Sequence, residues 1–194
     1  IKTVNSNISY KDGNNNFTSW KAGYTAPITY EEGTGISLPT ADNVEKEGYI
    51  FSGWYDNENF SGEPIDILDD AVRDDVVLYA KWKPERFTVT IPKRITLSGE
   101  TKSGTYTVTC TGAIGDSRYI SVVPDSFFTM TQKGKADITA TTVQQITKFR
   151  SADYTGSLGD DETEMGTDIE GTIHTPDLTA GSWNGSFNFK ITLI

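Results

Sequence analysis

The residue types that most often carry catalysis are scarce in this chain. His174 is its single histidine and lies beside a predicted turn. A Ser–His–acid triad would have to use this residue, yet the sequence holds no Gly-x-Ser-x-Gly elbow or other nucleophile context. One histidine also argues against a catalytic zinc site, which takes several such ligands. We therefore expect no catalytic residue and interpret the chain as a non-enzyme.

Cys110 is the only cysteine, so the chain can form no internal disulfide and no cysteine-based zinc cluster. It alternates in phase with Tyr106 and Val108, which predicts that all three side chains point to the buried face of one strand. A buried thiol of this kind behaves as a small apolar side chain.

Two clusters of acidic residues could offer oxygen ligands to calcium. The first holds five carboxylates between residues 66 and 75, and the second holds six between residues 160 and 170. Neither follows the EF-hand pattern of alternating acids with a central glycine and a terminal glutamate. We interpret both as solvated loops, with disorder as an alternative for the second, and expect no metal and no other cofactor.

Paired carboxylates are also the catalytic groups of glycoside hydrolases, so residue types alone leave that chemistry open. A hydrolase needs a concave site on a sizeable scaffold. Two small β modules are poor candidates for such a site, and an enzyme is the least favoured class.

The charge balance excludes two classes of partner. The formal net charge is −10, whereas phosphate binding needs clustered lysine and arginine. The same charge argues against adsorption on anionic membranes, and no apolar run approaches the ~20 residues that span a bilayer. We expect no nucleic acid partner and no membrane insertion of this segment.

The elements that must position any site are predicted to be strands. β-Branched and aromatic residues are plentiful, and 18 glycines and seven prolines interrupt the chain often. No long window has apolar residues at helical spacing, which predicts a mainly β fold. Residues 66–73 are the one stretch where one or two helical turns could form.

The most specific pattern is the block Gly-Tyr-Ile-Phe-Ser-Gly-Trp-Tyr at residues 48–55, followed by Leu-Tyr-Ala-Lys-Trp at residues 78–82. In this order the blocks resemble the internalin B-repeat family, also called the Listeria–Bacteroides repeat, over about residues 5–83. The resemblance implies a small β-grasp-like module of secreted or wall-associated bacterial surface proteins. It implies no catalytic residues, and it implies an extracellular or cell-wall location.

Strict alternation along residues 49–55 would place Phe51 and Trp54 on opposite faces of their strand. A β-bulge at Gly53 would bring both into one core, and glycine is where bulges are expected. A module of ~80 residues needs bulky core side chains. We therefore assign Trp54, Tyr79 and Trp82 to the core, with an aromatic platform for sugars as the alternative.

The first module is predicted to end near Pro84, because the repeat pattern stops at Trp82 and proline lacks the N–H of a central strand. The predicted domains are therefore residues 1–83 and residues 84–194. The second has about seven short strands separated by turns, which favours an immunoglobulin-like β-sandwich. In Thr-Val-Thr-Ile-Pro at residues 88–92 and Ala-Gly-Ser-Trp-Asn-Gly-Ser-Phe-Asn-Phe at residues 180–189, it resembles uncharacterised sandwich modules of Gram-positive surface proteins.

The clearest unit of the second domain is a predicted hairpin that turns at Asn184-Gly185. Its second strand would direct four alternating side chains to the core: Phe187, Phe189, Ile191 and Leu193. Asn184 and Asn188 are also conceivable partners for a Lys–Asn isopeptide crosslink, although no lysine stands out as the other partner.

The loop at residues 17–27 is several residues longer than the B-repeat pattern and carries Trp20 and Tyr24. Both residue types are enriched at interaction hot spots, and loops often carry binding residues on a rigid scaffold. We hypothesise that Trp20 and Tyr24 contact a partner. The alternative is that they cover the module's own core.

Together these features predict a non-catalytic part of a bacterial secreted or cell-surface protein that acts in display, spacing or adhesion. The alternative is a carbohydrate-binding module of a surface glycan-processing protein. Coplanar exposed aromatic rings would favour that alternative, and buried rings would favour a spacer. The sequence leaves open whether the partner is a protein or a glycan at the cell surface.

Overall fold

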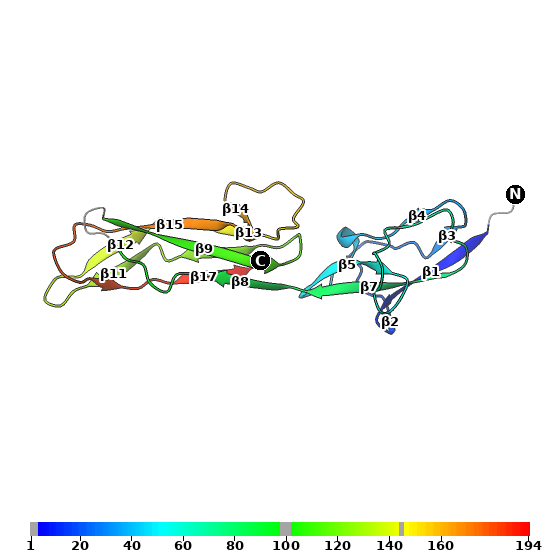
Figure 1. Ribbon diagram of the computed structural model, residues 1–194, viewed down its shortest axis with the longest axis horizontal. Helices are drawn as coiled ribbons and strands as arrows, with labels where there is room; N and C mark the ends of the chain where they lie inside the picture. The colour runs from blue at the N-terminus through cyan, green and yellow to red at the C-terminus, as the bar shows by residue number, and fades with distance from the viewer. Residues whose placement is uncertain (1–3, 98–101, 144–145) are drawn as a thin grey trace. The chain divides into compact units, whose positions relative to one another are not determined.

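The structure, a computed structural model, describes residues 4–97, 102–143 and 146–194 of the chain (Figure 1). Among these residues the fold is mainly β, and the single-turn 3-10 helix η1 (Ala41–Asn43) is the one helical element. The predicted fold class is therefore confirmed. The chain divides into two compact units, residues 1–85 and residues 86–194, which we call unit 1 and unit 2. Their independent folding stays a prediction.

Unit 1 is built on a mixed sheet in the order β2-β1-β7-β5, and β3 also pairs with β1. A small ladder of β4 and β6 lies outside this sheet. The strands of unit 1 are β1 (Asn5–Asp12), β2 (Asn15–Asn16), β3 (Thr29–Glu31), β4 (Ile36–Ser37), β5 (Tyr49–Tyr55), β6 (Ile67–Leu68) and β7 (Val76–Pro84).

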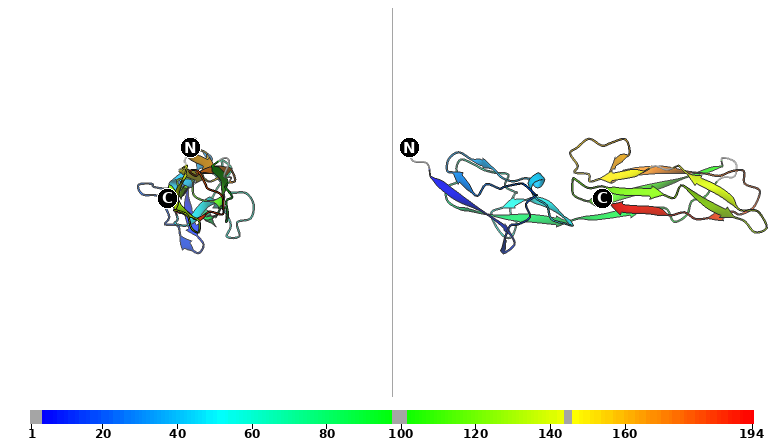
Figure 2. Two further views of the ribbon diagram at one scale, coloured as in Figure 1. Left: turned by 90° about the vertical axis from the view of Figure 1, so that its left-hand side faces the viewer. Right: turned by 180° about the vertical axis from the view of Figure 1, so that it is seen from behind.

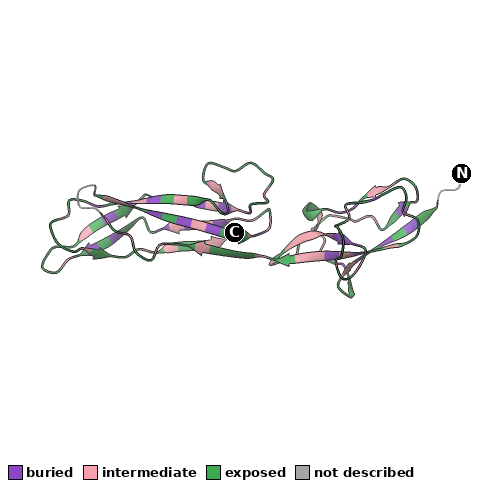
Figure 3. Cartoon of the chain, viewed as in Figure 1, coloured by how far each residue is buried: buried purple, intermediate pink, exposed green. Residues whose placement is uncertain are grey.

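The first and last strands of unit 1 are parallel neighbours in the middle of the sheet, with Ile8 opposite Val76 and Tyr10 opposite Leu78. Buried and exposed residues alternate along β1, which Figure 3 shows as changing colours along the strand. Period-two alternation directs one set of side chains to the core. Ile8 and Tyr10 therefore pack into the core of unit 1.

The bulge predicted at Gly53 is present. The register between β5 and β7 shifts between Phe51 and Trp54, and Gly53 has a φ of +106°. The Phe51 and Trp54 rings then both pack in the core, 5.1 Å apart. The Trp54 indole N–H donates to the Pro39 carbonyl oxygen at 2.7 Å, which satisfies a buried polar group.

The core assignment was right for Trp54 and Trp82 and wrong for Tyr79. Trp54 is 1% exposed, and Trp82 is half-buried against the same cluster. Tyr79 lies out of phase with the buried pair Leu78 and Ala80 of β7, so its side chain leaves on the opposite face of the sheet.

Residues 66–73 form no helical turn. Ile67 and Leu68 instead pair with Ser37 and Ile36, and Leu68 is buried. The Asp69 side chain then accepts a hydrogen bond from the Ala71 N–H. Such local side-chain bonds compete with helix formation, so burial and turn chemistry together decide this stretch.

Unit 2 is a β-sandwich of two sheets, ordered β14-β13-β10-β17 and β16-β11-β12-β15-β9-β8. The green strand β9 and the orange strand β15 run side by side in the second sheet (Figures 1 and 2). The strands of unit 2 are β8 (Arg86–Thr90), β9 (Ser103–Ala113), β10 (Ile120–Pro124), β11 (Phe127–Thr131), β12 (Ile138–Thr142), β13 (Thr147–Arg150), β14 (Glu162–Glu164), β15 (Asp168–His174), β16 (Asn184–Gly185) and β17 (Phe189–Leu193).

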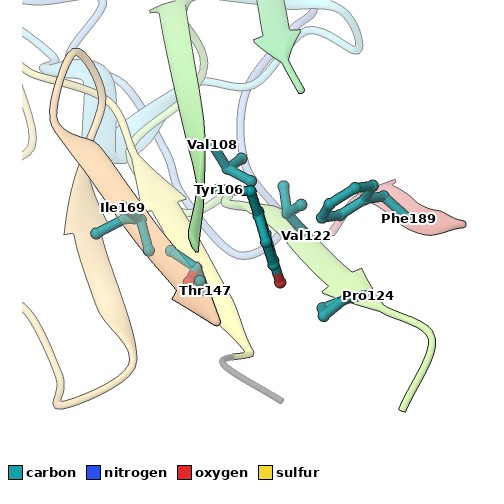
Figure 4. Close-up of a pocket in the computed structure, with 8 residues that line it drawn as sticks. Tyr106, Val108, Val122, Pro124, Thr147, Ile169 and Phe189 are labelled. Atoms are coloured by element: carbon teal, nitrogen blue, oxygen red, sulfur yellow. The ribbon is translucent and has the colours of Figure 1, made fainter. Parts of the chain in front are cut away.

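Side chains from both sheets fill the core of unit 2. Tyr106, Val108 and Cys110 of β9 are all buried, as their alternation predicted. Burial raises the pKa of the Cys110 thiol to about 11, so the thiol stays protonated at neutral pH. A void of about 10 Å³ is left between the sheets. The residues that line it are drawn in Figure 4, among them Tyr106, Val108, Val122, Pro124, Thr147, Ile169 and Phe189.

The predicted hairpin at Asn184-Gly185 is wrong. These two residues form β16, which pairs with β11, and the chain then crosses to the other sheet, where β17 pairs with β10. A Cβ added at Gly185 would lie 2.7 Å from the Thr129 carbonyl oxygen, so Gly185 permits close backbone approach and makes no turn.

The four side chains expected to face the core together do not all do so. Phe187, Phe189 and Leu193 pack against the core of unit 2, whereas Ile191 is 41% exposed. β17 is the last strand of its sheet, and an edge strand leaves part of its surface uncovered.

Candidate functional site: an uncharged groove in unit 1

A groove of about 440 Å³ runs along β1 of unit 1. On the side away from β7, β1 is paired only near its ends, by β3 at residues 5–7 and by β2 at residues 11–12. The groove lies at the residues between these ladders and under the long loop that follows β2. Its lining residues are Ile8, Ser9, Tyr10, Asn16, Phe17, Trp20, Tyr24, Thr25, Ala26 and Ile28.

Backbone hydrogen bonds hold the long loop in place. The Lys21 N–H donates to the Asn43 carbonyl and the Glu45 N–H donates to the Ser19 carbonyl, both at 2.9 Å. Trp20 forms an isolated bridge with Val44 between these two bonds. The wall of the groove is therefore anchored at Trp20, although the loop has no regular strand there.

Trp20 is half-buried and contacts three aromatic residues of the core. Its ring centroid lies 5.1 Å from Tyr10, 4.4 Å from Phe17 and 5.8 Å from Trp54. Tyr24 lies further out, with its ring 5.8 Å from the Trp20 ring and tilted by 41°. The two residues named from the sequence thus lie together on the groove. Trp20 also covers the core, so the two readings of it are compatible.

Tyr10 is the groove residue that sequence reasoning missed. It is 8% exposed, and its hydroxyl group has no hydrogen-bond partner within the part of the chain that the structure describes. Burial, and next the nearby Tyr24 hydroxyl, raise the pKa of Tyr10. The alternation of Ile8 and Tyr10 signals burial, but a missing hydroxyl partner becomes visible only in three dimensions.

The lining of the groove is uncharged, although the chain carries 27 acidic and 17 basic residues. Charged groups lie beside it: Lys11 donates to the side-chain oxygen of Asn16, a lining residue, at 2.7 Å, and Lys46 pairs with Asp12 at 2.8 Å. Ile28 is 69% exposed at the rim of the groove, which is unusual for an isoleucine. The site therefore combines aromatic walls, hydroxyl groups and an exposed aliphatic residue.

The aromatic rings of Trp54, Phe17 and Trp82 pack in the core of unit 1 and are not available as exposed binding surfaces. Trp54 is buried, and its ring meets Tyr10, Phe17 and Phe51 edge-on. The Phe17 and Trp82 rings are parallel, 6.1 Å apart, but Phe17 is only 6% exposed. These rings form core contacts, so they offer no flat exposed platform.

The groups first considered for chemistry lie apart from one another. His174 is exposed at the end of β15, between Ser103 and Thr141 of the neighbouring strands. Among residues 4–97, 102–143 and 146–194, no three His, Cys, Asp or Glu side chains gather as a metal site would require.

The second acidic cluster is mostly strand, so both the expected loop and the alternative of disorder are wrong for these residues: Glu162 and Glu164 lie in β14, and Asp168 and Glu170 lie in β15. Glu162 accepts from the Arg150 guanidinium at 2.7 Å and from the Gly159 N–H at 3.1 Å. Lys148 pairs with Asp161 at 3.1 Å. The Arg150 guanidinium lies about 5 Å from the ring centroids of Tyr119 and Tyr154, so basic and aromatic groups engage this loop.

The comparisons with known proteins concern unit 1. The family model of the Listeria-Bacteroides repeat domain matches residues 7–81, which confirms the resemblance predicted from the aromatic blocks. No solved structure matches the chain.

Two relatives from Evansella cellulosilytica are each 36% identical to this chain over 73 residues, or 38% of its length. They are provisionally named a Gly-rich membrane protein and a membrane protein. The match covers 8% of the first relative and 10% of the second, so the matched segment is a small part of either. Within the described residues of this chain, no helix is long and apolar enough to cross a membrane.

Proposed function

We propose that this chain is a non-catalytic part of a bacterial surface protein, and that it adheres to its partner through the groove of unit 1. The repeat match supports a surface-associated module, and the names of the two relatives are consistent with one. We place the protein outside the cell, on the cell wall or at the membrane surface. In this proposal unit 2 serves display and spacing.

The observation that carries the proposal is the combination of Trp20, Tyr24 and Ile28 around one uncharged groove. Ile28 is 69% exposed, and the Tyr24 ring packs on Trp20 outside the buried core. Binding hot spots are enriched in tryptophan and tyrosine and need pockets that exclude water. A groove of about 440 Å³ is within the range that holds small ligands or a partner's anchoring group.

The proposal is tested with beads that carry the full chain, applied to bacterial cells, animal cells and purified matrix proteins. A Tyr24→Ala/Ile28→Ser variant should lose most bead retention on the surface that binds wild type. Its melting temperature should fall by no more than a few degrees, because Ile28 is exposed and the half-buried Tyr24 lies outside the core cluster.

The matched control is Tyr49→Ala/Phe127→Ala, which removes two exposed aromatic residues outside the groove, 44% and 67% exposed. This control should retain the beads as well as wild type does. If the control loses retention and the groove variant keeps it, adhesion does not occur through the groove.

A further inference from the structure

Resting on the adhesive role proposed above, we infer that the groove of unit 1 binds an uncharged saccharide. The inference names the class of partner, which neither the family match nor the relatives assign. It depends on the charge of the groove, its polar groups, the state of the β1 edge and the placement of its aromatic rings.

The first step is charge. All ten lining residues are uncharged in a chain whose formal net charge is −10. No lining residue is a cation that could pair with an anionic glycan, the Lys11 ammonium beside the groove is already held by Asn16, and the net charge of the chain would repel an anion. A cationic ligand would find no carboxylate to pair with inside the groove, and burying an unpaired charge is costly. The ligand is therefore neutral.

The second step is the Tyr10 hydroxyl. It is buried, it has no partner among the described residues, and Tyr10 lines the groove beside Tyr24. A buried polar group without a hydrogen bond is costly, so it favours a ligand that supplies one. The hydroxyl oxygen is fully covered in the unliganded protein, so the ligand reaches it when neighbouring side chains move aside. A saccharide hydroxyl can then donate or accept there, whereas an apolar side chain of a partner protein would leave the group unpaired.

The third step argues against strand addition by a peptide. Strand addition needs free backbone groups at the edge of a sheet. In the groove, the Ile8 N–H already donates to the Ile28 carbonyl at 2.8 Å, and the Tyr10 carbonyl accepts from the Phe17 N–H at 2.9 Å. These two bonds leave no long run of free backbone groups along β1, which argues against strand addition at this edge.

The fourth step is the arrangement of the rings. Trp20 and Tyr24 are tilted by 41° with centroids 5.8 Å apart, so they pack on each other as a bent aromatic surface of the groove rather than one plane. Aromatic faces are electron-rich, and the C–H groups of a sugar ring can pack on them. Ser9, Asn16 and Thr25 add polar groups to the lining. Apolar walls with few polar groups are typical of small-ligand sites.

The experiment applies the full chain to an array of neutral oligosaccharides of glucose, galactose, mannose and N-acetylglucosamine, beside sialylated and sulphated glycans. Titration calorimetry then measures the affinity of any neutral glycan that binds. Tyr10→Phe should lower this affinity about 2- to 12-fold, the effect of one neutral hydrogen bond. It should leave the melting temperature unchanged or higher, because the hydroxyl has no partner in the unliganded protein.

The matched control is Tyr30→Phe. Tyr30 is equally buried, at 4% exposed, but its hydroxyl donates to the Asp74 carbonyl at 2.6 Å. This variant should lower the melting temperature and leave glycan affinity unchanged. Tyr24→Ala should weaken glycan binding more than Tyr10→Phe does, because it removes a wall of the groove.

The inference is overturned if no neutral glycan binds at millimolar concentration, if charged glycans bind better, or if Tyr10→Phe leaves the affinity unchanged. Bead retention that depends on Tyr24 and Ile28 without any glycan binding would keep the adhesive role and point to a protein partner. Groove-dependent glycan binding without bead retention would keep the saccharide site and reject the adhesive role.

Discussion

At the scale of single residues, Gly53 sets how the central aromatic residues of unit 1 pack. Its φ of +106° is available to glycine and strained for other residues. The bulge at Gly53 turns Trp54 into the core beside Phe51. Trp20, in the wall of the groove, then packs against Trp54. The position of this bulge could be predicted because a glycine lies between two aromatic residues that both need burial.

Gly53→Ala should destabilise unit 1 by about 1–3 kcal/mol, from backbone strain and overpacking. An added Cβ would lie 2.5 Å from the Pro64 Cβ. Urea denaturation measures the change in the free energy of unfolding. Gly62→Ala is the control, because Gly62 also has a positive φ, +87°, but nothing lies within 4 Å of its added Cβ. Equal losses in the two variants would show that the Pro64 contact contributes nothing.

For Tyr10, the sequence predicts burial but not the missing hydrogen-bond partner of its hydroxyl group. Its burial follows from alternation along β1, but its unpartnered hydroxyl depends on which groups the loop at residues 17–28 brings near. The sequence predicted Trp20 and Tyr24 because their types are unusual in a loop. It offered no comparable signal for Tyr10, since a buried tyrosine normally finds a partner.

At the scale of elements, two carboxylates hold the start of β1. The Asp75 side chain accepts from the Asn7 N–H at 2.7 Å and from the Asn7 amide at 3.0 Å. Glu32 accepts from the Ser6 hydroxyl at 2.5 Å and from the Asp74 N–H. The hydrogen bonds from Asn7 lower the pKa of the Asp75 carboxyl group. The bond from Ser6, and to a lesser extent the bond from the Asp74 N–H, lowers the pKa of Glu32.

Because both pKa values are lower in the folded state, ionisation of these groups favours folding. Their contribution is fully present above the ordinary pKa values of 3.8 and 4.5, and it is lost as the pH falls through the lower folded values. Asp75→Asn/Glu32→Gln should therefore flatten the dependence of the unit 1 melting temperature on pH below about pH 5. A pH dependence as steep as that of wild type would contradict this assignment.

In unit 2, the short strand β14 depends on a charged contact with β13. Arg150 donates to Glu162, and their side chains are 15% and 12% exposed. Glu162→Ala should release the loop at residues 152–161, which limited proteolysis would detect as faster cleavage there than in wild type. Asp160→Ala, in the same exposed loop, serves as the control and should be cleaved at the wild-type rate. Equal cleavage of Glu162→Ala and wild type would show that Arg150 does not hold the loop.

Element pairing was predicted well where local alternation decides it and poorly where distant segments decide it. The strands β7 and β9 follow from their alternating apolar residues, and β5 follows from its aromatic block with a bulge at the central glycine. The Asn184-Gly185 turn failed because β11 pairs with these residues instead, a contact across more than 50 positions. The helical turn predicted at residues 66–73 is absent for the same reason, because Ile67 and Leu68 pair with β4.

At the scale of the whole molecule, each unit has a core cluster of its own. Calorimetry should therefore resolve two unfolding transitions. Phe149, which is 0% exposed, lies in the core of unit 2. Phe149→Ala should lower the temperature of only one transition, through a loss of about 3–5 kcal/mol in the free energy of unfolding of unit 2. Trp54→Ala should lower only the other. One cooperative transition that both variants shift together would contradict independent units.

The central claim is that the partner binds at the groove of unit 1, and nuclear magnetic resonance of the indole N–H groups tests it most directly. The chain has four tryptophans; Trp20 lines the groove, and Trp183 lies in unit 2 with its N–H donating to the Thr179 carbonyl. A soluble extract of the surface that retains the beads is titrated into labelled protein. The Trp20 signal should shift or broaden while the Trp183 signal stays unchanged. An unchanged Trp20 signal with a shifted Trp183 signal would contradict the account.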